Sequence, residues 1–197
     1  MDEVTVEMVD GSGAKQKMIR IPRFNLENVD PVLGSGPHPA FIAKNGVRDA
    51  IYLGERHAVV IGGRVRVASG KRGKGNITLD EARRLCVAMG PGWHLANAWE
   101  WSAIVMSILL WGENPFTFER LEWIDGLKIV DGKLFFPESN TLTEEADWPA
   151  HGVFFDTEGY NNGVSAGLAY LDLVYRLGRS HSTLGFRPAF VEDYYSE

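Results

Sequence analysis

Cysteine and histidine are the side chains that most often carry redox, nucleophilic or metal chemistry, and in this chain they are few and scattered. The chain has one cysteine, Cys86, which lies on the apolar side of a helical pattern and is predicted to be a small buried residue. No histidine spacing suits zinc, and no nucleophile elbow accompanies a Ser-His-Asp order. We therefore expect no catalytic residues, no bound metal and no enzymatic activity. The five histidines are His38, His57, His94, His151 and His181.

One acidic stretch could bind a hard cation. Calcium takes several carboxylate and amide oxygens that converge from neighbouring segments. A solvated acidic loop is our preferred interpretation of this stretch, which leaves cofactors at none, with a structural calcium as the alternative. The oxygen-bearing residues are Glu138, Asn140, Glu144, Glu145 and Asp147.

Residues 159–187 differ in composition from the rest of the chain. They contain no Lys, Gln, Glu, Met or Trp, although all five types occur elsewhere, and nearly all the types present can be reached from an asparagine codon by changing its first two bases. Tyr and Arg are frequent here, and both supply large contact area with a polar end. An ordinary surface loop would include Lys and Glu, so we interpret this stretch as a ligand-binding surface.

Two blocks far apart in the sequence carry a family resemblance. The first is Gly90-Pro91-Gly92-Trp93-His94-Leu95, with Asn97 and Glu100-Trp101 after it. The second ends in Gly185-Phe186-Arg187-Pro188-Ala189-Phe190 and has Asn161-Asn162-Gly163 and Ala166-Gly167 upstream. Together they resemble the variable proteins of diversity-generating retroelements. Weaker matches to the family's strand order at 18–21, 38–42 and 50–53 extend the resemblance from about residue 18 to 190.

The resemblance implies an α+β C-type lectin fold, with two helices packed on short antiparallel sheets with long loops. It also implies a receptor-recognition function, with a mutagenised surface that binds a protein ligand on a host or target cell, plausibly at a virus tail. Homo-oligomers would add avidity to such a surface. Two alternatives stay open: a carbohydrate-binding lectin domain, and a protein like the formylglycine-generating enzymes, which share the superfold. The second needs a pair of cysteines, and this chain has one.

Within 152–190 the resemblance separates a frame from variable positions. Leu171 and Leu173 alternate at period two, which places both on the core face of a strand. The rest of the frame is Asn161, Asn162, Gly163, Ala166, Gly167, Gly185, Phe186 and Arg187. The candidate ligand-binding residues between and before them are Phe155, Asp156, Thr157, Tyr160, Tyr170, Asp172, Val174, Tyr175, Arg176, Gly178, Arg179, His181, Ser182 and Thr183.

Composition narrows the classes of partner. A length of 197 residues with 45% hydrophobic content suits one sizeable core. The net charge of -6 argues against nucleic acid and anionic membranes as partners. No start typical of a signal peptide is present, and the apolar run 104–111 is too short to span a bilayer, so we expect synthesis in a cytoplasm, without membrane insertion, and assembly into a virion if the resemblance holds.

The elements that would position these residues can be read along the chain. Alternation around Asp10-Gly11-Ser12-Gly13 predicts a hairpin, which we take as an N-terminal extension (1–24) to a lectin-like domain (25–197). Residues 22–40 carry four prolines and are predicted to form an irregular surface connection. Short strands are predicted at 50–53, 58–61, 64–68, 121–124, 127–130 and 133–136.

Two helices are expected between these groups of strands. Thr78 and Glu81 form a capping box that predicts a helix to about residue 89. Asn97 predicts a second helix to about residue 110. Its expected buried stripe is Trp101, Ile104, Val105 and Ile108.

Overall fold

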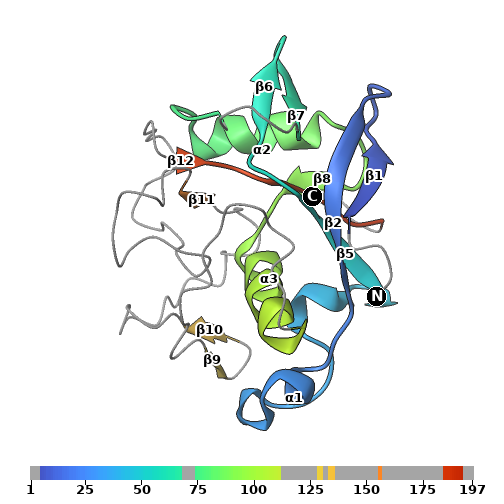
Figure 1. Cartoon of the computed structure of the whole chain (residues 1–197), viewed down its shortest axis with the longest axis vertical. Helices are drawn as coiled ribbons and strands as arrows, with labels where there is room; N and C mark the ends of the chain where they lie inside the picture. The colour runs from blue at the N-terminus through green and yellow to red at the C-terminus, as the bar shows by residue number, and fades with distance from the viewer. Residues whose placement is uncertain are drawn as a thin grey trace.

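The computed structural model describes residues 5–67, 74–111, 128–130, 133–135, 155–156 and 184–192. Within them the fold is mixed α+β, with few helices and short antiparallel sheets (Figure 1). The strands of the main sheet are β1 (Thr5–Val9), β2 (Lys15–Pro22), β5 (Ala50–Gly54), β8 (Trp93–Leu95) and β13 (Pro188–Phe190). The longer helices are α2 (Leu79–Val87) and α3 (Ala98–Trp111).

The main sheet has the order β1-β2-β5-β13-β8, and every neighbouring pair is antiparallel. The predicted hairpin is confirmed as β1 and β2, and β2 continues into the sheet by pairing along β5. The boundary between 1–24 and the remainder stays a prediction. From the other end of the chain, β13 inserts between β5 and β8. The sheet therefore joins segments from the start, middle and end of the sequence.

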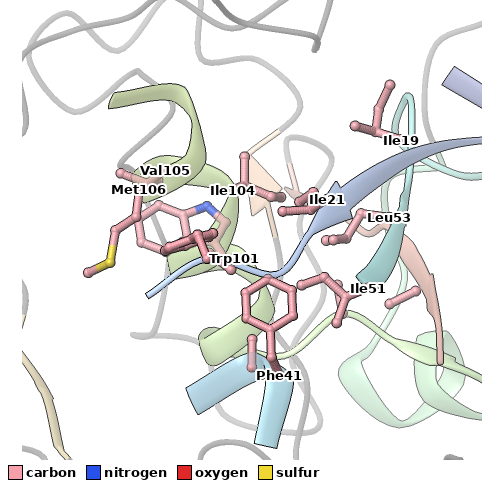
Figure 2. Packing of buried hydrophobic residues seen from close by; sticks show 14 of the residues in the cluster. Ile19, Ile21, Phe41, Ile51, Leu53, Trp101, Ile104, Val105 and Met106 are labelled. Atoms are coloured by element: carbon pink, nitrogen blue, oxygen red, sulfur yellow. The ribbon is translucent and has the colours of Figure 1, made fainter. Parts of the chain in front are cut away.

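Each face of the sheet carries its own hydrophobic cluster. Side chains two apart on a strand share a face, and Ile19 and Ile21 of β2 join Ile51 and Leu53 of β5 in the cluster that packs on α3 (Figure 2). Met18 belongs to the second cluster, with Trp93, Phe186 and α2. The two helices thus lie against different faces of one sheet (Figure 1).

Both predicted helix starts are confirmed. The Thr78 side chain accepts the Glu81 amide at 3.2 Å at the start of α2. At α3 the Asn97 Oδ1 accepts the Glu100 amide at 3.0 Å, and the Glu100 carboxylate accepts the Asn97 amide at 3.0 Å. Each reciprocal bond satisfies an amide that the first helical turn leaves without an internal partner.

The single buried stripe predicted for the second helix is wrong. All of residues 101–107 are buried, including Ser102 and Ser107, because α3 is enclosed on several sides by the sheet and by the segment before β3. The two serines satisfy their hydroxyls locally: Ser102 donates to the Trp99 carbonyl and Ser107 to the Ile104 carbonyl. The side chain of Ile108 lies outside the described residues.

The segment 22–40 also differs from the prediction. It contains α1 (Leu26–Val29) and the 3-10 turns η1 (Pro31–Leu33) and η2 (Pro39–Phe41), where 38–42 was expected to fit a strand. Phe24, Leu26, Leu33 and Phe41 are buried against α3. The prolines interrupt any regular apolar period, so the sequence pattern did not reveal this covering of the core.

Small hairpins complete the described structure. They are β3 (Ile42–Ala43) with β4 (Gly46–Val47), β6 (Val59–Ile61) with β7 (Arg64–Arg66), and β9 (Lys128–Val130) with β10 (Lys133–Phe135). The last two pairs agree with the predicted strands. The predicted strand 121–124 lies outside the described residues.

Candidate ligand-binding site

The two sequence blocks that carry the resemblance are hydrogen-bonded neighbours. In the pairing of β8 with β13, Pro188 lies opposite Leu95, Ala189 opposite His94, and Phe190 opposite Trp93. The pairing extends past both strands, because the Ala96 amide donates to the Arg187 carbonyl and the Val191 amide to the Gly92 carbonyl, each at 3.1 Å. We call this pairing, with residues 90–97 and 185–191, the frame junction.

Gly92 shows how closely the frame junction is packed. Its φ is +83°, a region that L side chains rarely adopt. A Cβ atom there would lie 2.5 Å from the Phe190 ring and 2.6 Å from the Val191 carbonyl oxygen. Phe190 also contacts the Trp93 ring, with 5.3 Å between centroids. Any side chain at position 92 would therefore push β13 away from β8.

A buried polar pair ties the frame junction to α3. The His94 Nε2 lies 2.7 Å from the Glu100 carboxylate, and its Nδ1 lies 3.1 Å from the Gly92 carbonyl oxygen. Because a carbonyl only accepts, Nδ1 carries a proton, and the contact with Glu100 shares a further one between ring and carboxyl. The structural hydrogen bond predicted for His94 is confirmed. The sequence alone did not point to Glu100 as its partner, although the capping position of Glu100 beside Asn97 was visible.

The chain that leads into β13 is anchored by both backbone and side chain. Phe186 is fully buried, and its carbonyl accepts the Ala58 amide at 2.8 Å. The buried Arg187 guanidinium donates from Nη1 to the carbonyls of Gly54 at 2.8 Å and Glu55 at 2.9 Å. Burial and the charge of Arg187 lower the pKa of His57 well below its ordinary value. The sequence marked 185–187 as frame without showing these carbonyl partners.

The ends of the predicted variable segment are brought together. Strand β11 (Phe155–Asp156) pairs antiparallel with β12 (Leu184–Gly185), with Phe155 opposite Gly185 and Asp156 opposite Leu184. Figure 1 shows β12 leading directly toward the main sheet. Residues 157–183 therefore leave the described structure at Asp156 and return to it at Leu184, one step before the anchored Phe186.

Only part of the candidate site falls within the described residues. Phe155 and Asp156 are placed, as β11, and the frame residues Gly185, Phe186 and Arg187 are buried as expected of a frame. The other twelve candidate ligand-binding residues lie outside the described residues. So do the frame positions from Asn161 to Leu173 and the acidic stretch 138–147. Their roles stay predictions.

The remaining cysteine and histidine chemistry is structural in the described parts. Cys86 is buried, as predicted, and burial raises the pKa of its thiol. His38 accepts the Ala40 amide at Nδ1, so its Nε2 carries the proton that is donated to the Ser102 hydroxyl at 3.0 Å. Burial lowers the pKa of His38 to about 3. Among the described residues no three or more His, Cys, Asp or Glu side chains are grouped to hold a metal ion.

The comparisons with known proteins identify no relative. No protein-family model matches the sequence, and no curated protein sequence matches it either. In the part of the chain that the structure describes, no helix has the length and apolar character needed to cross a membrane.

Proposed function

We propose that this chain is a ligand-binding protein that displays a retroelement-diversified recognition surface, within residues 157–183, on a C-type-lectin-like scaffold. The observation that carries the proposal is the pairing of β11 with β12, which closes the ends of this segment beside the frame junction. A surface that changes its sequence repeatedly needs ends that stay fixed. The buried Phe186 and Arg187 supply that fixed attachment on the β12 side.

The chemistry of the segment favours a protein ligand. Tyr160, Tyr170 and Tyr175 give rigid aromatic contact area, and Arg176 and Arg179 give planar donors for carboxylates. Such residues lose little rotamer entropy on binding compared with lysine or glutamate. A host-surface protein bound by a virus tail or by a cell-surface adhesin fits this composition, and the cations favour an acidic epitope.

A pair of matched libraries tests the proposal. One library randomises Tyr170, Tyr175, Arg176, Arg179 and His181, and the control library randomises five exposed scaffold residues, Lys17, Asn28, Arg64, Asp80 and Arg84. Both are displayed, checked for folded protein by thermal melting, and selected against the same panel of purified protein ligands. We expect specific binders from the first library only. Equal yields from the two libraries, or loss of folding in the first, would contradict the proposal.

The surrounding DNA gives an independent test of diversification. We expect a near-copy of the codons for about 152–190, with adenines where the two copies differ, near a reverse-transcriptase gene. A complete locus without either would remove the retroelement from the proposal. A glycan array with strong calcium-dependent hits, unaffected by Tyr175→Ala and Arg179→Ala, would instead support the lectin alternative and move the site to 138–147.

A further inference from the structure

A pocket of about 360 Å³ opens beside the β3–β4 hairpin, within the usual range for binding sites. We call it the hairpin pocket. Its walls come from β2, β5, the hairpin and the residue after β13 that the structure places there, and the side chains used below are Arg20, Val47, Arg48, Asp49, Tyr52 and Glu192. It lies at the opposite end of β13 from β12, because β12 precedes Pro188 and Glu192 follows Phe190. The pocket is therefore separate from the surface in 157–183.

The floor of the hairpin pocket is rigid. Arg20 lies opposite Tyr52 in the pairing of β2 with β5, and Tyr52 lies opposite Phe190 in the pairing of β5 with β13, so these three side chains share one face of the sheet. The Tyr52 and Phe190 rings also meet edge to face, with 6.1 Å between centroids. Arg48 donates from Nη1 to the Ala40 carbonyl at 3.2 Å, which orients its guanidinium. A ligand would meet prearranged groups.

The charge of the hairpin pocket differs from that of the whole chain. The chain has a net charge of -6, whereas Arg20 and Arg48 line the pocket and Arg23 lies at its edge, paired to Asp49 at 3.5 Å. Three guanidinium groups thus face two carboxylates, those of Asp49 and Glu192. Guanidinium groups bind carboxylates through paired hydrogen bonds. The pocket favours an acidic ligand that the rest of the surface would repel.

Apolar contact area lies next to these charges. Ile42 and Val47 are opposite each other in the β3–β4 hairpin and are 56% and 45% exposed. A cross-strand apolar pair of this kind offers a contact for an apolar side chain. Asp49 and Glu192 can accept backbone amides of a bound peptide, while they would repel a polyanion such as nucleic acid. Cations, an apolar pair and two acceptors together match a polypeptide.

We propose that the hairpin pocket binds an acidic peptide segment of a partner protein, with its carboxylates on Arg20 and Arg48 and an apolar side chain on Ile42 and Val47. The proposal does not depend on the proposed function of residues 157–183. In an assembly, this end of the molecule would attach to a partner while the opposite end of β13 carries the recognition surface.

The test measures fluorescence anisotropy with a labelled ten-residue peptide of alternating Glu and Leu, and with the same peptide carrying Lys in place of Glu. We expect the acidic peptide alone to bind the full chain, and its affinity to fall as salt rises. Arg20→Glu should weaken binding at least roughly fivefold, whereas Asp49→Lys, which removes a repelling carboxylate and releases Arg23 to the ligand, should tighten it. Loss of folding cannot produce that pair of opposite effects.

Arg64→Glu is the matched control, since Arg64 is an exposed arginine on β7 that does not line the pocket. It should change the affinity less than twofold. Equal binding of the two peptides, or an Arg64→Glu effect as large as that of Arg20→Glu, would overturn the proposal. Tighter binding of a single-stranded oligonucleotide than of the acidic peptide would overturn it as well, and so would dimerisation that Arg20→Glu abolishes without any peptide binding.

Discussion

The frame junction and the β3–β4 hairpin are both short antiparallel pairings, yet they constrain their residues very differently. At the frame junction Trp93, Leu95 and Ala189 are buried, and Gly92 leaves no room for a Cβ. In the hairpin Ile42 and Val47 project large apolar side chains into solvent. Strand pairing alone therefore does not limit what a position can accept. The limit comes from the second layer of atoms, which covers one pairing and leaves the other open.

The largest contrast should come from a cavity beneath the frame junction. Phe186→Ala removes a fully buried ring, and we expect a loss of roughly 3–5 kcal/mol in the free energy of unfolding. Chemical denaturation of wild type and variant measures the loss. Phe190→Leu, at a partly buried position, serves as the milder comparison and should cost less. A cost for Phe186→Ala below that of Phe190→Leu would show that the ring does not support the junction.

Gly92→Ala should be the next largest change. The new Cβ meets the Phe190 ring at 2.5 Å and sits on a backbone with φ of +83°, so we expect a loss of about 2–4 kcal/mol. Gly13→Ala provides the control, because Gly13 also has a positive φ, +80°, but open space around its Cβ. Gly13→Ala should lose only the backbone part, about 1–2 kcal/mol. Equal losses would mean that close packing at Gly92 contributes nothing.

Acid should weaken the core that the β3–β4 hairpin follows. The unfolded histidine titrates near about 6.5, and burial lowers the pKa of folded His38 to about 3. Between these values the unfolded chain binds more protons, so the free energy of unfolding falls as pH falls, with a slope of up to about 1.4 kcal/mol per pH unit from this group. The lowered pKa of His57 acts with the same sign.

Removing His38 isolates its share of this pH dependence. His38→Gln should be less stable at pH 8, because it disturbs the bonds to Ala40 and Ser102, but its stability should fall less steeply than wild type between about pH 6 and 4. Denaturation midpoints measured across pH give the slope separately from the level. An unchanged slope would show that His38 is protonated in the folded protein over this range.

The smallest effect should be at the hairpin. Ile42→Thr and Val47→Thr keep a β-branched side chain at exposed positions, so each should change the free energy of unfolding by about 0.5 kcal/mol or less. Thermal melting of the two variants measures this. A loss above about 2 kcal/mol would show that the hairpin is covered in the protein in solution, which would also bear on the hairpin pocket.

Local signals in the sequence determined a large part of the described fold. The hairpin around Asp10–Gly13, the helix starts at Thr78 and Asn97, and the strands near 50–53 and 128–135 all depend on side-chain and backbone groups a few residues apart. The mixed α+β class follows from counting such elements. Burial of Cys86 also followed from a local period, because one helical face recurs every three to four residues.

Only the tertiary structure decided how distant segments meet. Insertion of β13 between β5 and β8, the anchoring of Arg187 on the Gly54 and Glu55 carbonyls, and the pairing of β11 with β12 join residues that can be more than a hundred positions apart. No local period encodes such pairings, since the backbone groups that form them are the same at every residue. The enclosure of α3 and the hairpin pocket have the same cause. Packing from several segments decides what is covered, and the sequence of any one segment does not.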